Sequence, residues 1–234
     1  MSDSDLSYEL ARWYESAAGQ RIRQQISAKL PKIVATIPGQ QHAQIGVGCW
    51  PSMYKKSMQL SYHDVFGAEV NPGVLPNSMD SLLLIHALDV NSDPQRILHI
   101  ADKLVAKSGH LIIVGFNPLS LWGIMRLPML ALRRSPWRSG FYSLWRTRDW
   151  LKVLNYEVRL QTSLVQMPPL PGALELNALD KLLHWLMPNW GAVNIIVAKR
   201  PWFPMTGVKN YKIKQRLEAA VIPEPTTRNI KNKV

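Results

Sequence analysis

The strongest constraint on the fold is a pattern of strand, helix and strand in the middle of the chain. Residues 81–85 (SLLLI) and 111–114 (LIIV) are continuous apolar runs, as expected of strands that are covered on both faces. Between them, Ser92 or Asp93 can cap a helix that ends before Gly109. Two strands joined by one helix lie parallel in a right-handed crossover, so the sequence predicts a mostly parallel sheet.

The remaining elements are marked by the spacing of apolar residues and by turn signals. Apolar positions recur at three- and four-residue steps through residues 6–37, which is typical of an amphipathic helix or a helix pair. Pro31 is expected to break or kink this segment. The other predicted elements are a short strand from His42 into the turn at 46–48, short strands within 59–65 and 68–70, a helix at about 147–154, a strand over 156–164, a helix over 173–187 and a last strand over 192–198.

The composition excludes several classes of protein. The chain has 234 residues, 47% of them hydrophobic and 19% charged, and can bury a substantial core, which excludes a disordered regulator and a coiled coil. Cys49 is its one cysteine, so neither a disulfide framework nor a cysteine-based zinc module is expected. The first residues show no signal peptide, and the longest apolar stretch, 119–132, is too short for a membrane span. We therefore expect a cytoplasmic protein without a transmembrane segment.

The excess of positive charge that gives the net charge of +12 lies in the second half of the chain. Residues 1–118 hold ten Lys or Arg and ten Asp or Glu, whereas residues 119–234 hold eighteen and six. This asymmetry is compatible with an acidic partner for the second half, which could be nucleic acid, anionic lipid or a phosphorylated metabolite. A solvated basic surface with a loose tail explains the same charge equally well.

One long stretch of the sequence resembles a known family. Residues 75–88 (LPNSMDSLLLIHAL), continued by Asp-Pro at 93–94 and by KSGHL at 107–111, follow in an ungapped register the pattern of class I S-adenosylmethionine (SAM)-dependent methyltransferases, specifically the type 11 domain. The resemblance covers residues from about 42 to 200. It implies an α/β fold with a doubly wound, Rossmann-like, seven-stranded sheet, mostly parallel with an antiparallel last strand, and SAM bound across the carboxyl ends of the early strands.

The resemblance and the charge pattern divide the chain into three regions. An N-terminal helical segment is expected over 1–41 and the methyltransferase-like domain over 42–200. An insertion at about 119–146, rich in Leu, Trp and Arg, would lie over the pocket. It could serve as an apolar lid, as an element that lies on a membrane surface or as a patch that binds a partner, or it could simply pack against the sheet. Residues 201–234 lack a sustained apolar period and are expected to form a basic, flexible tail.

The glycine turn is the first candidate for cofactor binding. Gly46, Val47 and Gly48 follow the first expected strand, where the family has its glycine-rich motif, so the resemblance makes them cofactor-binding residues. A turn without Cβ atoms lets the backbone approach a ligand, although a tight turn needs no ligand. The usual acid and the third glycine of the motif are absent, and Gln44 and Trp50 stand near their positions. The Trp50 side chain would either narrow the pocket or pack under the loop.

The ribose and adenine determinants depart further from the family. Only twenty-two residues separate Gly48 from Asn71, too few for the customary elements, so this early segment of strand and helix is expected to be shortened. For the acid that holds the ribose, Glu69 is preferred to Asp64 on spacing, although both also suit exposed loops. Asn71 stands where the family has the acid that binds the adenine amino group, and Leu75 is assigned to the same pocket. An Asn-Pro-Gly turn explains the asparagine equally well.

His86 is the candidate catalytic residue. It follows the run at 81–85, where the resemblance places the methyl group and the acceptor, and an imidazole there can take a proton from an attacking oxygen or nitrogen. A satisfied histidine at a strand end is the alternative, and no metal is expected. The sequence thus predicts transfer of a methyl group from SAM to an unknown acceptor. The competing hypothesis is a non-catalytic methyltransferase-fold protein that binds nucleic acid, anionic lipid or a protein through its basic half.

Overall fold

The computed structural model describes residues 3–48, 50–66, 73–120, 123, 140–164, 185 and 190–201. Contacts between residues group 1–202 into one compact unit and 203–234 into a second. All the described residues belong to the first unit. The expected tail beyond residue 201 therefore lies outside the described residues, as do the helix expected at 173–187, apart from residue 185, and most of the insertion expected at 119–146.

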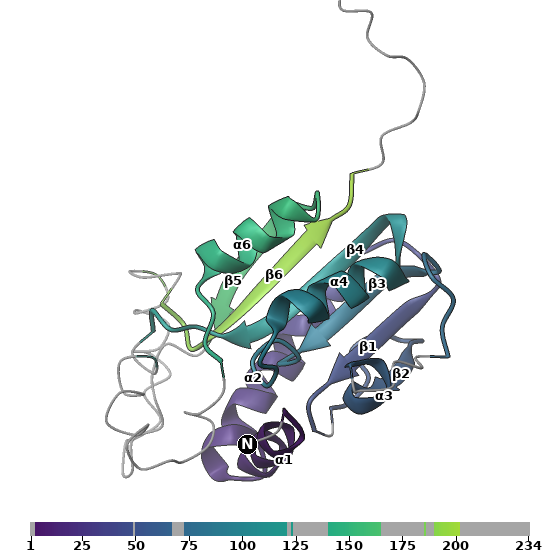
Figure 1. Ribbon diagram of the computed structural model, residues 1–234. Helices are drawn as coiled ribbons and strands as arrows, with labels where there is room; N and C mark the ends of the chain where they lie inside the picture. The colour runs from purple at the N-terminus through teal and green to yellow at the C-terminus, as the bar shows by residue number, and fades with distance from the viewer. Residues whose placement is uncertain are drawn as a thin grey trace, which may run out of the picture. The chain divides into compact units, whose positions relative to one another are not determined.

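The first unit is an α/β fold built on one mixed sheet (Figure 1). Its described helices are α1 (Asp3–Trp13), α2 (Ala17–Val34), α3 (Tyr62–Phe66), α4 (Pro94–Leu104) and α6 (Leu144–Val153). Its strands are β1 (His42–Gly46), β2 (Met58–Ser61), β3 (Met79–Ile85), β4 (Val105–Phe116), β5 (Glu157–Leu164) and β6 (Val193–Lys199).

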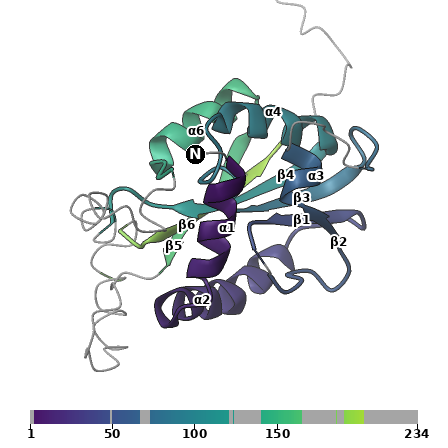
Figure 2. The same ribbon diagram turned by 60° about the horizontal axis from the view of Figure 1, so that its bottom comes forward.

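The order of the strands in the sheet is β2-β1-β3-β4-β6-β5. The first four are parallel, and β6 runs antiparallel to both β4 and β5. Helices α4 and α6 cover one face of the sheet and α2 covers the other (Figures 1 and 2). The doubly wound sheet with an antiparallel last strand is confirmed. It has six strands among the described residues in place of the expected seven, which agrees with a shortened segment between β1 and β3.

The N-terminal segment is a helix pair that breaks between α1 and α2 and not at Pro31. Ser16 caps α2, because its side chain accepts a hydrogen bond from Gly19 N (3.2 Å). A Cβ on Gly19 would lie 2.5 Å from Tyr14 Cα, so only glycine allows the first turn of α2 to pack so closely on the end of α1. Pro31 lies inside the last turn of α2, and the buried Val34 still belongs to that helix.

The segment after β1 contains a single strand followed by a short helix. The expectation of strand structure through residues 59–65 is correct only for β2, because Tyr62–Phe66 form α3. The buried side chains of α3 are Tyr62, Val65 and Phe66, whose spacing of three and four residues places them on one helical face. The strand expected at 68–70 lies outside the described residues.

The central unit of β3, α4 and β4 forms as expected, with a different boundary. Asp93 is the N-cap of α4 and accepts from Arg96 N (3.0 Å). The helix ends at Leu104, and β4 starts at the next residue, so Gly109 lies within the strand. The pairing of β3 with β4 is interrupted between Met79 and Ser81, since an irregularity in the register absorbs the extra residues of β4.

Candidate active site

The carboxyl ends of β2, β1 and β3 form the edge of the sheet at which the chain changes direction. From β1 the chain runs to β2 on one side and then crosses to β3 on the other, so the gap between β1 and β3 is a topological switch point. Ligands of open α/β sheets bind in such crevices. Helix α1 lies across this edge (Figure 2), and Ser7 Oγ in α1 is 3.3 Å from His63 Nε2 in α3.

The glycine turn at the end of β1 is closely packed by the protein itself. Gly48 has φ +86°, a left-handed conformation that glycine adopts without strain. A Cβ on Gly46 would lie 2.8 Å from Trp50 Cδ1, and a Cβ on Gly48 would lie 3.1 Å from Ala11 Cβ in α1. The close approach that these two glycines permit is therefore made by a tryptophan ring and by a helix.

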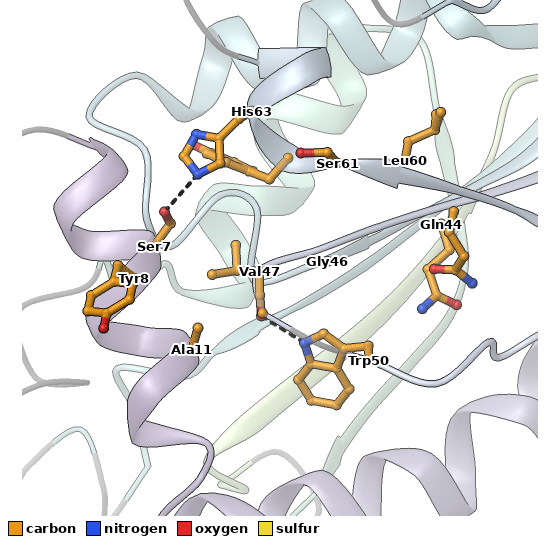
Figure 3. Close-up of a pocket in the computed structure, with 13 residues that line it drawn as sticks. Ser7, Tyr8, Ala11, Gln44, Gly46, Val47, Trp50, Leu60, Ser61 and His63 are labelled. Carbon is orange, nitrogen blue, oxygen red and sulfur yellow. Dashed lines mark hydrogen bonds between the residues drawn. The ribbon is translucent and has the colours of Figure 1, made fainter.

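A pocket of about 530 Å³ opens beside this turn. Its walls come from α1, from the glycine turn and from the carboxyl end of β2 with the start of α3 (Figure 3). The predicted residues Gly46, Val47 and Gly48 are part of the wall. No carboxylate is present among the described residues that line it, which are Ser7, Tyr8, Ala11, Gln44, Gly46, Val47, Gly48, Trp50, Gln59, Leu60, Ser61, Tyr62 and His63.

Gln44, near the position of the family's acid, is used to hold the loop that carries Trp50. Its side chain is buried, its Nε2 donates to Pro51 O (3.0 Å), and its Oε1 accepts from Met53 N (2.9 Å). Both ends of the amide are thus bound to the loop backbone. The glutamine stabilises the conformation of this loop, which a carboxylate could not do in the same way because it has no N–H to donate.

His86 lies at the end of β3 and is fully buried. Its φ of +56° is in the left-handed region, which is uncommon for a residue with a side chain and is often found at functional sites. Both ring nitrogens have partners, since Nδ1 is 2.7 Å from Asp89 Oδ2 and Nε2 is 2.5 Å from the Tyr14 hydroxyl. With Nδ1–H donating to the Asp89 carboxylate, Nε2 accepts a hydrogen bond from the Tyr14 hydroxyl. His86 does not line the described pocket.

Tyr14 and Asp89 complete a buried hydrogen-bonded chain that the sequence did not single out. Asp89 Oδ2 also accepts from Phe116 N (3.0 Å), which fixes the carboxylate against the end of β4. Burial, followed by the charge of Asp89, raises the pKa of Tyr14 well above its ordinary value, so its hydroxyl stays protonated and can donate. The signal for Asp89 was its position three residues after His86. Tyr14 is 72 residues from His86 in the sequence, and nothing local connected them.

Aromatic rings fill the space above the switch point. The ring centroids of Tyr14 and Trp50 are 4.9 Å apart, those of Trp50 and His86 are 6.1 Å apart, and those of His86 and Phe116 are 4.4 Å apart. The Arg23 guanidinium of α2 lies 5.6 Å from the Tyr14 ring and 5.5 Å from the Trp50 ring. The crevice between β1 and β3 is therefore occupied by this aromatic cluster, and the open pocket lies beside it.

The structure brings only some of the predicted site residues together. Leu75 is 77% exposed and is not part of the pocket wall. Asp64, the less favoured candidate for ribose binding, lies on the exposed side of α3. Glu69 and Asn71 lie outside the described residues, so their roles stay predictions. Ser61 and His63 line the pocket at the end of β2, where an acid was sought, and the sequence analysis did not single them out.

Comparison with solved structures identifies proteins with a similar fold. A SAM-dependent methyltransferase of Thermotoga maritima matches 81% of the chain and 94% of its own length with a TM-score of 0.52 at 15% sequence identity. The chain has the class I methyltransferase fold. The protein bound to the Trm112 methyltransferase activator of Haloferax volcanii is similar to the same extent, with a TM-score of 0.53 at 14% identity over 85% of this chain and 99% of that one.

Sequence comparison adds one relative to these methyltransferase-fold structures. No family model matches the sequence. YafS of Escherichia coli, an uncharacterised protein, is 36% identical over 146 residues, which are 62% of this chain and 58% of YafS. The match thus spans little more than half the length of that relative. The resemblance to methyltransferases is confirmed for the fold, which is what similarity at such low identity shows.

Two further properties concern the described residues alone. Among them, no three His, Cys, Asp or Glu side chains lie close enough together to hold a metal ion. Over the same ranges, no helix combines the length and the apolar character needed to cross a membrane.

Proposed function

We propose that this protein is a SAM-dependent methyltransferase that binds the nucleoside part of its cofactor in the pocket between α1, the glycine turn and β2. The observation that carries the proposal is the position of this pocket at the carboxyl ends of β1 and β2 in a class I methyltransferase fold. Its volume of about 530 Å³ lies within the range of small-molecule sites.

The pocket offers suitable groups for a nucleoside. Gln59, Ser61 and His63 provide hydrogen-bonding atoms at its β2 side, and residues 46–48 form part of its wall. Glu69 remains the proposed partner of the ribose, and Asn71 remains the proposed partner of the adenine. SAM supplies an electrophilic methyl group bound to a sulfonium. The lone pair of an aligned acceptor can bond to the methyl carbon while the carbon–sulfur bond breaks and S-adenosylhomocysteine leaves as a neutral thioether.

His86 is the proposed base for this reaction. A proton released by an acceptor hydroxyl or amine would go to His86 Nε2, and Asp89 would hold the ring through Nδ1 and stabilise the cation that forms. Because Tyr14 occupies Nε2, this role requires the tyrosine hydroxyl to move away from the histidine. The acceptor is proposed only as a nucleophile of this kind.

A second candidate function is supported by a specific observation. The Trp50 ring packs against Gly46, and the described lining contains no carboxylate, which are features of a fold that no longer binds SAM. In that case the protein would act through its basic second half, by binding nucleic acid, anionic lipid or another protein.

Calorimetric titration of the full-length protein with S-adenosylhomocysteine, the demethylated product, distinguishes the two. We expect saturable binding to one site. Ser61→Trp should abolish it by filling the pocket, because Ser61 is exposed in the pocket wall. Ser108→Trp is the matched control, since Ser108 is also an exposed strand serine but lies outside the pocket wall. A folded protein that shows no binding, or binding that Ser61→Trp leaves unchanged, would exclude this pocket as the cofactor site.

A further inference from the structure

Trp50 stands between the open pocket and the end of β3. The pocket lies against the carboxyl ends of β1 and β2, whereas His86 follows β3 on the other side of the switch point. The Trp50 ring borders the pocket and also faces His86, with 6.1 Å between the two ring centroids. A ligand that starts in the pocket and reaches toward β3 must therefore pass the position of the indole.

The indole is firmly held in this position. Its Nε1–H donates to Val47 O (2.9 Å), as Figure 3 shows, and its Cδ1 atom occupies the space that Gly46 leaves free. Tyr14 packs edge to face against it, and the Arg23 guanidinium covers it at 5.5 Å. Only 7% of the Trp50 surface is exposed. The indole is thus a closed wall of the pocket and not a loose surface ring.

We propose that Trp50 is a plug that decides which adenosyl compounds the site accepts. Resting on the proposed function, this inference concerns the part of the ligand that extends beyond the nucleoside. An adenosyl compound with a short 5′ substituent fits the pocket as it stands. A compound that carries an amino-acid arm toward the switch point must first displace the indole from Val47 and Gly46.

Displacement of the plug also affects His86. Tyr14 contacts the Trp50 ring on one side and covers His86 Nε2 with its hydroxyl on the other. When Trp50 leaves, Tyr14 loses a packing partner and can separate from the histidine. Entry of the arm and uncovering of the base are then coupled, so the base is exposed only when a complete cofactor is present. When most molecules are closed, the apparent affinity for the full cofactor is the intrinsic affinity multiplied by the fraction of molecules that are open.

The test compares two ligands and two tryptophan variants of the full-length protein. S-adenosylhomocysteine carries the amino-acid arm, and 5′-methylthioadenosine carries a methyl group in its place. Trp50→Ala should raise the affinity for S-adenosylhomocysteine by about tenfold or more and change that for methylthioadenosine by less than about threefold, if the open form is a minority below about 10%. Trp145→Ala is the matched control, because Trp145 is 69% exposed on α6, and it should change neither affinity.

Several outcomes separate the plug from the proposed function. If Trp50→Ala weakens both ligands equally, Trp50 is an ordinary wall of the site and the inference fails. If the wild-type protein binds methylthioadenosine but not S-adenosylhomocysteine, and Trp50→Ala binds both, the proposed function fails and the plug stands. If the variant is folded and still binds neither, both fail. Should Trp50→Ala not fold, Trp50→Phe provides the same comparison, because it shortens the ring and removes the N–H donor to Val47.

Discussion

The hydroxyl of Tyr14 provides the hydrogen bond that satisfies His86 Nε2 inside the protein. Tyr14→Phe removes this donor with little change in shape and leaves a buried ring nitrogen without a partner. We expect the free energy of unfolding to fall by about 1–3 kcal/mol, the usual penalty for such a group. Urea denaturation measures the change. Tyr8→Phe is the control, since Tyr8 is 71% exposed in α1, the helix that ends just before Tyr14, and its loss should cost less than about 0.5 kcal/mol. Equal losses in the two variants would contradict the buried chain.

The glycine turn illustrates what a residue pattern can and cannot predict. Gly46 and Gly48 after an apolar strand predicted a tight turn whose backbone the cofactor approaches closely. The turn forms, and the groups that lie against these two glycines are the Trp50 ring and Ala11 of α1, while cofactor contact stays a prediction. The sequence analysis left open whether Trp50 narrows the pocket or packs under the loop. It does both, because the ring packs against the turn and forms part of the pocket wall.

At the scale of elements, the link between α2 and the sheet depends on one carboxylate. Asp80 Oδ2 in β3 accepts from Gln40 N (2.8 Å) and Gln41 N (3.0 Å) in the segment that leads into β1. These two hydrogen bonds lower the pKa of Asp80 below its ordinary value. A lowered pKa means that the native state favours the charged form, so this stabilisation is present above about pH 4 and disappears as the pH falls further.

Asp80→Asn should therefore destabilise the protein at neutral pH and have a progressively smaller effect below about pH 4. The midpoint of urea denaturation at pH 7, 5 and 3 measures this dependence for the variant and the wild-type protein. Asp149→Asn serves as the control, because the Asp149 side chain on α6 is 73% exposed and pairs only distantly with Lys152. A difference between Asp80→Asn and wild type that stays constant over this range would show that the charge of Asp80 is not responsible.

Elements were predictable where local signals agreed with tertiary packing. The apolar runs of β3 and β4 and the capped helix α4 carried their own signals, and all three are present. Helix α3 was mistaken for strand because Tyr62, Val65 and Phe66 are of types that favour strands, whereas burial of one helical face decided for the helix. The contact of Tyr14 with His86 depends on how α1 crosses the sheet edge, which no local pattern encodes.

At the scale of the whole molecule, part of the net positive charge lies in residues beyond the first compact unit. The contacts that define the first unit end at Trp202. Residues 203–234 hold seven Lys or Arg and two Asp or Glu, and so contribute a net charge of +5. If the acidic partner expected from the sequence is bound through this segment, the affinity depends on counterion release and weakens linearly with the logarithm of the salt concentration.

Removal of residues 203–234 should leave the thermal midpoint unchanged, because the remaining unit holds the sheet and the described helices. It should reduce the salt dependence of binding to a DNA duplex, with the slope falling by up to about six if all seven cations contact phosphates. Fluorescence anisotropy at several salt concentrations measures this slope. A full-length variant with the seven Lys and Arg replaced by Gln separates charge from length, and it should behave like the truncated protein. If both variants keep the wild-type slope, an acidic partner must contact the basic residues between 119 and 202 and not the tail.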